Sequence, residues 1–169
     1  MSVRPILVCP HPTLRAVAAP VAHFDETVAA AIADLVETMR AHGAIGLSAP
    51  QIGMTRAIAV IDPDGEGATP QVYVNPRIVA KGRAFGFVQE SCLSLPGVKA
   101  SVWRDTRVRV QAQDAEGRVF ERDLAGMAAV SLQHEIDHLA GRLFVDRLSP
   151  LRRWMIRRRV GAAAMGLAA

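Results

Sequence analysis

The pattern His134-Glu135-Ile136-Asp137-His138 constrains this chain more than any other feature of its sequence. On an α-helix, residues four positions apart lie on the same face, so both imidazoles can reach one metal ion. The glutamate between them is placed to act on a water at that ion, which is the minimum needed for metal-assisted hydrolysis. The apolar stretch 125–139 predicts the helix that this arrangement requires. A histidine pair on a half-buried helix without a metal is the alternative.

The length and composition predict an ordinary folded protein. The chain has 169 residues, of which half are hydrophobic and 21% are charged. This length predicts one domain over residues 1–169, with a core that needs no disulfide. The sequence has no apolar run of about 18 residues, and its N-terminal apolar stretch is too short for a secretory signal. We therefore expect a cytoplasmic protein with no membrane partner.

The net charge of +4 is concentrated at the C-terminal end. Residues 147–169 contain six arginines and no acidic residue, a charge of +6, whereas residues 1–146 contain 14 basic and 16 acidic residues, a charge of −2. A solvated helix face is one interpretation of this basic C-terminal helix and tail, and an electrostatic contact with phosphate, RNA in particular, is the other. Because no aromatic stacking platform or nucleic-acid motif accompanies the arginines, we do not expect specific recognition of DNA.

The periodicity of the chain predicts an α+β fold. Asp25 is a suitable N-cap for a first helix that Gly43 ends. The expected strands cover residues 56–61, 72–74, 77–80, 106–112 and 118–122, with the last two forming a hairpin. A short extended stretch is expected at 143–145, before the arginine-rich terminal helix. We expect antiparallel or mixed β-sheets packed around the central motif helix, with further helices at both ends of the chain.

Two histidines of a catalytic metal site need a third ligand, which must be Cys, His, Asp or Glu. His11, His23 and His42 have no local motif that marks them as ligands. Cys92 lies in a tight loop just after a strand, and such a loop can present a thiol. Two histidines and one cysteine leave a fourth position open for water, which is typical of a catalytic site. A buried free thiol is the alternative for Cys92, and the expected state of Cys9.

Three segments together resemble the signature motifs of the peptide deformylase family. They are Ile-Gly-Leu-Ser-Ala-Pro-Gln at 45–51, Glu-Ser-Cys-Leu-Ser at 90–94 and Gln-His-Glu-Ile-Asp-His-Leu at 133–139. Many metalloproteases share the third motif, but the three in this order are highly specific. The resemblance covers almost the whole chain. It implies a metal-dependent hydrolase that removes the N-formyl group from the N-terminal formyl-methionine of newly synthesised polypeptides and releases formate.

The resemblance also implies a role for particular residues. The ligands of one divalent metal ion would be Cys92, His134 and His138; Fe²⁺ is expected in the cell, and Zn²⁺, Ni²⁺ or Co²⁺ are possible substitutes. Glu135 would be the general acid and base, while Gln51 and the backbone N–H of Leu93 would stabilise the oxyanion. Ile45 and Gly46 would align N-formyl-methionyl nascent peptides as an added strand, with Ser91 beside the substrate. Apart from the resemblance, the positive charge of the arginine-rich C-terminal helix leads us to expect the ribosome as a partner.

Further side chains are expected to support the ligands. The resemblance implies an ion pair between Glu90 and Arg104, for which a solvated Arg104 is the alternative. Asp137 is expected either to orient an imidazole or to serve the structure. Both expectations concern residues that touch the metal site without binding the ion.

Ala44 and Ser91 depart from the family pattern, which has glycine at both positions. A side chain is tolerated at residue 44 if its φ is negative. If residue 91 needs a positive φ, or if substrate backbone passes over it, the side chain of Ser91 would narrow the cleft or slow turnover. Two alternatives therefore remain. One is a deformylase-like paralogue of weak or altered activity, and the other is a non-catalytic, ribosome-associated metal-binding module. Glu135 argues against the second, because such a module needs no base there.

Overall fold

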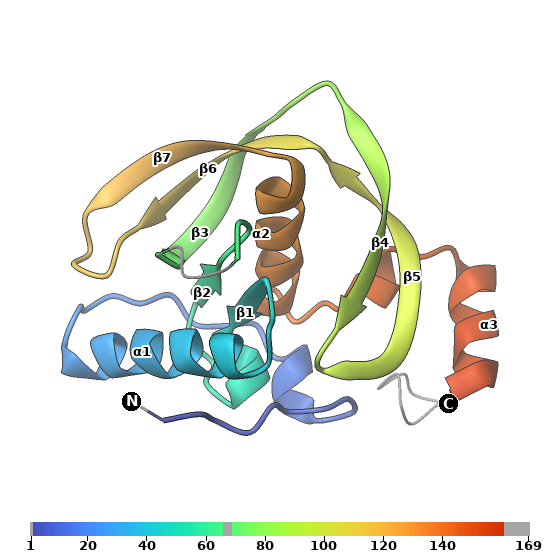
Figure 1. Ribbon diagram of the computed structural model, residues 1–169, viewed down its shortest axis with the longest axis horizontal. Coiled ribbons are helices and arrows are strands. Elements are labelled where there is room, and N and C mark those ends of the chain that lie inside the picture. The colour runs from blue at the N-terminus through green and yellow to red at the C-terminus, as the bar shows by residue number, and fades with distance from the viewer. Residues whose placement is uncertain (1, 66–68, 161–169) are drawn as a thin grey trace.

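The computed structural model describes residues 2–65 and 69–160, and it has the predicted α+β architecture (Figure 1). Its helical elements are η1 (Pro12–Arg15), α1 (Glu26–Ala41), η2 (Ala49–Ile52), α2 (Gly126–Leu139), η3 (Phe144–Arg147) and α3 (Pro150–Val160). Its strands are β1 (Gly46–Ser48), β2 (Ile58–Ile61), β3 (Gln71–Lys81), β4 (Phe85–Cys92), β5 (Leu95–Asp105), β6 (Arg107–Gln113) and β7 (Val119–Ala125). Within the described ranges, no helix combines the length and the apolar character needed to cross a membrane.

Two antiparallel sheets enclose the motif helix. The larger has the strand order β1-β2-β3-β6-β7, and the smaller is the β4–β5 ribbon. Figure 1 shows α2 passing between them, while α1 lies along the β1 side of the larger sheet. Leu132 and Ala129 of α2 are fully buried against strand residues such as Tyr73 and Val110. This packing fixes the helix that carries both histidines, as the sequence predicted.

The first helix forms for the reasons that its sequence indicated. Asp25 Oδ1 accepts hydrogen bonds from the backbone N–H of Thr27 at 3.0 Å and of Val28 at 3.1 Å, so it satisfies two donors that the first turn leaves free. Leu35 and Met39 lie on the buried face, in the same core cluster as residues of β1 and β2. The chain leaves the helix at Gly43, whose φ is +59°. This helix therefore positions the segment that leads into β1.

Four details of the sequence-based prediction were wrong. The strand β5 was not predicted, because Pro96-Gly97 interrupts its start. Cys92 is the last residue of β4 and not a loop residue. The strands at 72–74 and 77–80 are one strand, β3, which bulges at Asn75, where φ is +51°. Of residues 143–145, which were expected to be extended, only Leu143 is: Asp146 Oδ2 accepts a bond from its N–H at 2.8 Å, and the chain turns into η3 at Phe144.

Candidate active site

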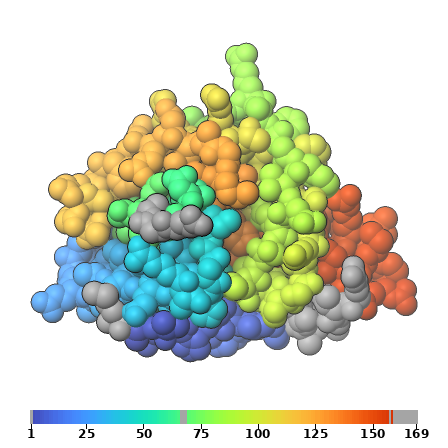
Figure 2. Space-filling view, viewed as in Figure 1, coloured from blue at the N-terminus to red at the C-terminus, as the bar shows by residue number. Residues whose placement is uncertain are grey.

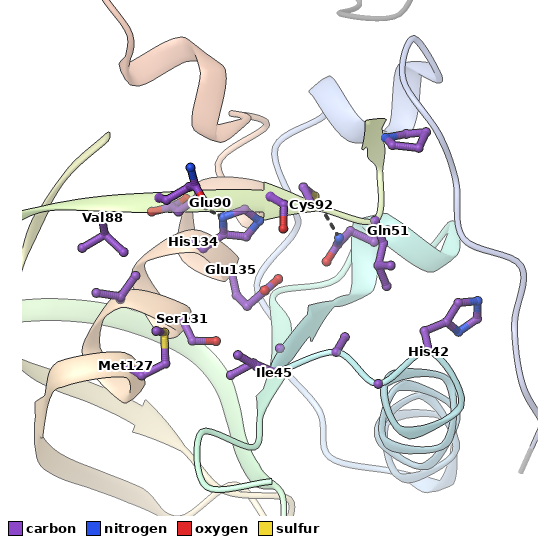
Figure 3. Close-up of a pocket in the computed structure, with 18 of the residues that line it drawn as sticks. His42, Ile45, Gln51, Val88, Glu90, Cys92, Met127, Ser131, His134 and Glu135 are labelled. Carbon is purple, nitrogen blue, oxygen red and sulfur yellow. Dashed lines mark hydrogen bonds and ion pairs between the residues drawn. The ribbon is translucent and has the colours of Figure 1, made fainter. Parts of the chain in front are cut away.

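A cavity of about 510 Å³ opens between the segment after α1 and the β4–β5 ribbon. In Figure 2 the surface is hollowed between these two segments, and α2 lies behind the hollow. Residues 42–46 and Gln51 form one wall, residues 88–93 with Pro96 and Gly97 form the opposite wall, and residues from Met127 to Glu135 of α2 form the floor. The three segments that carry the motifs of the resemblance therefore meet at one cavity (Figure 3).

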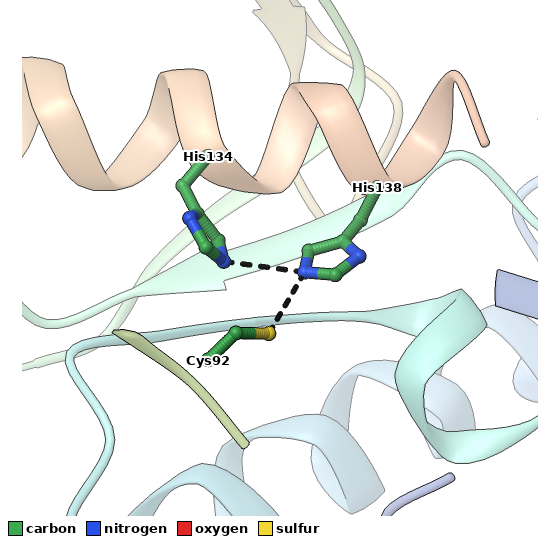
Figure 4. A group of neighbouring side chains, drawn as sticks. All are labelled: Cys92, His134 and His138. Atoms are coloured by element: carbon green, nitrogen blue, oxygen red, sulfur yellow. Dashed lines mark hydrogen bonds between the residues drawn. The ribbon is translucent and has the colours of Figure 1, made fainter. Parts of the chain in front are cut away.

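The predicted ligands converge beside this cavity. His138 Nε2 lies 3.2 Å from Cys92 Sγ and 3.2 Å from His134 Nε2 (Figure 4). All three atoms lie within 4.8 Å of one another. The helical spacing of α2 places the two imidazoles on one face, and the end of β4 brings the sulfur to them. Among the described residues this is the one such group of histidine, cysteine and carboxylate side chains. His42 lies at the cavity rim and belongs to no such group.

The chemistry of these three donors fits a divalent metal ion. Around a tetrahedral ion, with bonds of about 2.1 Å to nitrogen and 2.3 Å to sulfur, ligand atoms lie roughly 3.3 to 3.6 Å apart. The separations of 3.2 Å are close to that range. Burial alone would raise the pKa of Cys92, but the neighbouring imidazoles of His138 and His134 lower it well below its usual value. This direction favours the thiolate, which is the form that binds metals.

A buried carboxylate orients the first histidine. Glu90 Oε2 lies 2.8 Å from His134 Nδ1, which leaves Nε2 of that ring directed at the other two ligands. Arg104 holds Glu90 from behind through bonds of 2.6 and 2.9 Å, and its side chain is fully buried. Burial would raise the pKa of Glu90, but the bonds from Arg104 and His134 outweigh it and lower the pKa to about 2. The expected Glu90–Arg104 ion pair is confirmed, and the solvated alternative is wrong.

Asp137 does not orient an imidazole. Its carboxylate accepts a bond of 2.6 Å from Arg104 and bonds of 2.5 and 2.7 Å from Arg147. It therefore ties α2 to β5 and η3, which is the structural role that the sequence left open. The Nδ1 atom of His138 is buried and has no hydrogen-bond partner among the residues that the structure describes. Arg147 is a supporting residue that sequence reasoning missed, since it lies outside all three motifs.

Gln51 is held with its amide nitrogen directed at the ligands. Its Oε1 accepts bonds from the N–H of Ser48 at 2.9 Å and from the hydroxyl of Ser48 at 3.0 Å. Its Nε2 consequently points the other way, 3.5 Å from Cys92 Sγ and 3.4 Å from Ser94 Oγ (Figure 3). Sequence reasoning missed Ser48, although the spacing Ser-x-x-Gln is a capping-box pattern that identifies such a pair.

Glu135 lies on the cavity floor beside the backbone of β1. Its pKa is raised because burial disfavours the charged carboxylate, while the charges of His134 and His138 oppose that effect. A Cβ on Gly46 would lie only 2.7 Å from Ser131 Oγ and 2.8 Å from Glu135 Oε1. Glycine at position 46 therefore permits β1 to approach α2 closely. Ser131 was also missed, because nothing local marks a serine in an apolar helix as a cavity residue.

The remaining predicted residues line the same cavity. Ile45 is half exposed at one wall, Ser91 is exposed at the opposite wall, and Leu93 follows Cys92 in the turn after β4. Neither Ala44 nor Ser91 has a positive φ; within the described ranges Asn75 is the only non-glycine residue that does. Both side chains are therefore compatible with their backbone conformation. Eight of the nine residues that the sequence analysis assigned to catalysis, substrate or metal line this cavity, and the ninth, His138, lies behind it in contact with Cys92 and His134.

Comparisons with known proteins agree on one family. The family model described as polypeptide deformylase matches residues 3–154. A peptide deformylase of Alkalilimnicola ehrlichii is 48% identical over 162 residues, which are 95% of this chain and 90% of that protein. The crystal structure of a peptide deformylase from Legionella pneumophila has a TM-score of 0.88 and 44% identity, covering 93% of this chain and 92% of that one. The peptide deformylase structure from Thermotoga maritima has a TM-score of 0.83 and 37% identity, covering 89% and 100%.

Proposed function

Because this chain belongs to the peptide deformylase family, we propose that it removes the N-formyl group from the N-terminal formyl-methionine of newly synthesised polypeptides and releases formate. One observation carries the proposal: the sulfur of Cys92 and one nitrogen from each of His134 and His138 lie within 4.8 Å of one another, beside a cavity whose floor also holds Glu135. That set contains a place for a metal ion, an acid–base group and a space for substrate.

The ion would be held by Cys92, His134 and His138. We propose Fe²⁺ as the ion in the cell, with Zn²⁺, Ni²⁺ or Co²⁺ as substitutes, because thiolate and imidazole donors suit these metals better than they suit Mg²⁺ or Ca²⁺. When bound, a divalent ion supplies Lewis-acid chemistry, polarising a carbonyl and lowering the pKa of water. Glu90 and Arg104 would act indirectly, by fixing the ring of His134 in the orientation that ligation requires.

Glu135 would move the proton. It takes a proton from the attacking water and returns it to the amine nitrogen that leaves as formate forms. Its position on the cavity floor, beside the ligands and next to Gly46, puts the carboxylate within the space that a substrate enters. Burial raises the pKa of this carboxyl, which makes it a stronger base than an exposed glutamate.

Gln51 and Leu93 would stabilise the charge that develops on the formyl oxygen. The amide nitrogen of Gln51 is already turned toward Cys92 because Ser48 holds its oxygen, so no reorientation is needed during the reaction. The backbone N–H of Leu93 would be the second donor. Leu93 follows the cysteine ligand directly and lies on the wall opposite Gln51, so the two donors would approach the formyl oxygen from opposite sides.

The substrate backbone would lie along Ile45 and Gly46, with Ser91 opposite. Backbone pairing of this kind recognises a peptide with little dependence on its side chains, which suits an enzyme that acts on many nascent chains. The methionine side chain needs an apolar surface, and Val88, Met127 and Val130 provide one along the cavity. We propose these three residues as the source of methionine preference.

We also propose that the protein works in the cytoplasm and meets the ribosome through α3. The six arginines of residues 147–169 and the absence of acidic residues there support an electrostatic contact with ribosomal RNA. The predicted tail at residues 161–169 lies outside the described part of the structure. Co-sedimentation with ribosomes over a series of salt concentrations tests this contact.

The hydrolase proposal is tested by anaerobic purification, metal analysis and formate release from a formyl-methionyl peptide on one sample. We expect about one divalent ion per chain, by analogy with a single three-ligand site, and formate release that stops when the ion is chelated. An acetyl-methionyl peptide is the matched control for substrate. A metal-loaded preparation that releases no formate would refute the proposal.

A further inference from the structure

The outer face of the β4–β5 ribbon carries three large aromatic side chains that are open to solvent. Phe85, Phe87 and Trp103 are 67%, 49% and 57% exposed. Phe87 and Trp103 are paired across the two strands, and Phe85 lies two residues from Phe87 on the same side. The ring of Trp103 lies 5.3 Å from that of Phe85 and 5.1 Å from that of Phe87. These three contiguous rings are called the aromatic face here, and exposed apolar patches of this kind mark interaction sites.

An arginine from α3 lies against the aromatic face. The guanidinium of Arg152 is 5.1 Å from the centroid of Phe87, and the side chain is exposed. On the same helix, Arg158 lies 4.9 Å from the ring of Trp154, which is itself half exposed. The sequence analysis found no aromatic platform beside the arginines, whereas the structure places aromatic rings next to Arg152 and Arg158. The platform is formed mainly by strands that are distant from α3 in the sequence.

The polar groups around the aromatic face leave it positively charged. Asp105, which pairs with Phe85 across the ribbon, is bound by Lys81 at 3.0 Å. Further along the same side, Lys99 is exposed opposite Ser91. The surface thus carries flat rings with the guanidinium of Arg152 beside them. Among the residues named here, the one carboxylate, that of Asp105, is paired with Lys81.

We propose that the aromatic face, together with Arg152, binds single-stranded RNA. Unpaired bases stack on exposed aromatic rings with little regard to sequence, and arginine neutralises the adjacent phosphate. An anionic membrane also attracts aromatic and basic side chains, but it requires a continuous apolar surface that can enter the bilayer. Here the Lys81–Asp105 pair lies beside the rings and Lys99 lies further along the same side of the ribbon, which favours a ligand that has both flat bases and negative charge. This inference deepens the RNA contact proposed for α3 by adding a surface on which bases stack, and it does not depend on the hydrolase activity.

Tryptophan fluorescence gives a direct test in the full chain. The protein contains two tryptophans, so Trp154→Phe leaves Trp103 as the only one while keeping an aromatic ring on α3. Titration with a short single-stranded RNA is expected to quench the emission of Trp103 to saturation, because a stacked base contacts that ring. The affinity is expected to fall as the salt concentration rises.

Two substitutions and a matched control localise the binding. Phe87→Ser and Arg152→Gln are each expected to weaken RNA binding about tenfold, and Arg152→Gln to reduce the salt slope by about one. Arg122→Gln is the control: Arg122 lies 5.4 Å from the ring of Phe120, on a strand of the other sheet. It is expected to leave RNA affinity unchanged. All three variants should release formate at the wild-type rate, because none of these residues lines the cavity.

The same experiment separates failure of this inference from failure of the hydrolase proposal. Absence of quenching by RNA, or an equal loss of affinity in Arg122→Gln, would overturn the RNA site while leaving formate release untouched. Quenching by anionic phosphatidylserine vesicles, with none by RNA, would overturn it in favour of a membrane. RNA binding that depends on Phe87 and Arg152 supports the site whether or not formate is released.

Discussion

Glu90 Oε2 lies 2.8 Å from His134 Nδ1, and this contact fixes which nitrogen of the ring is offered to a metal. Because Nδ1 is engaged, Nε2 is the free nitrogen, and it lies 3.2 Å from His138 Nε2. Arg104 in turn holds Glu90, so the orientation of one ligand depends on a buried arginine from the neighbouring strand β5. The predictions below follow from this arrangement and from its neighbours.

Replacing the cysteine ligand should lower the affinity for the metal ion while leaving the protein folded. We expect Cys92→Ser to weaken binding of Fe²⁺ or Zn²⁺ by at least about tenfold, because a hydroxyl is a poorer ligand for these ions than a thiolate. Metal content after dialysis against a chelator of known affinity measures the change. Cys9→Ser is the matched control, since Cys9 is buried in the same cluster but is not among the grouped ligand atoms. Equal metal retention by the wild type and Cys92→Ser would contradict the ligand role.

Removing the proposed base should separate metal binding from catalysis. Glu135→Ala is expected to retain the ion and to lose about 10² to 10⁴ of its turnover, the range typical of a general acid–base group. Formate release and metal content on one sample provide both readouts. If turnover falls only in proportion to metal content, Glu135 is needed to retain the metal ion and does not act as a base.

The buried ion network should be sensitive to loss of its central cation. Arg104→Leu removes the guanidinium that pairs with Glu90. It also removes one of the two guanidinium groups that lie within 2.7 Å of Asp137, the other being that of Arg147. Because buried carboxylates would lose their partner, we expect the free energy of unfolding to fall by about 3 to 5 kcal/mol. Arg109→Leu is the control, because Arg109 pairs with Asp123 at the surface and such pairs contribute about 0 to 1 kcal/mol. Urea denaturation followed by circular dichroism measures both. Similar midpoints for the two variants would show that the buried network contributes little.

A single methyl group beside the proposed base should impair catalysis. The Cβ of Gly46→Ala would lie 2.8 Å from Glu135 Oε1 and 2.7 Å from Ser131 Oγ, so the carboxylate must shift. Because displacements of about 1 Å can lower rates about 10²-fold, we expect a loss of up to that size with the ion retained. Ala44→Gly, two residues earlier in the same wall, is the control and should remain active. Full activity in Gly46→Ala would show that Glu135 tolerates displacement.

The N-terminal segment should contribute stability that depends on pH. The backbone N–H of Ser2 lowers the pKa of Asp34, and Arg4 adds to this effect, against the opposing effect of burial. A carboxyl whose pKa is lower in the folded state stabilises the protein above its unfolded pKa, and that contribution is lost as the pH falls through the folded value. We expect Asp34→Asn to cost about 1 kcal/mol at neutral pH. The difference from wild type should begin to shrink below about pH 4, the unfolded pKa of an aspartate, and vanish only below the lower folded pKa.

Chemical denaturation of the wild type and Asp34→Asn at a series of pH values measures this difference. Glu116→Gln, at an exposed turn, controls for the change in net charge. A difference that persists unchanged in acid would mean that Asp34 stabilises the fold through its shape and not through its charge.

The sequence by itself determined the features that depend on neighbours along the chain. The repeat of the α-helix places His134 and His138 on one face, and the side chain of Asp25 caps the helix that follows it. Local spacing suffices for these because the interacting groups are separated by only a few residues. The three motifs also contain many of the residues that line the cavity, although no motif by itself showed that the three segments meet there.

Only the tertiary structure decided the contacts between distant segments. Cys92 and His138 are 46 residues apart, and Glu90 and His134 are 44 apart, so their contacts depend on how the β4–β5 ribbon packs against α2. The same packing buries Arg104 and turns Phe87 toward solvent beside Arg152. Alternation along a strand predicts that its faces differ, but not which face another element covers, because that is set by the summed packing of the whole chain.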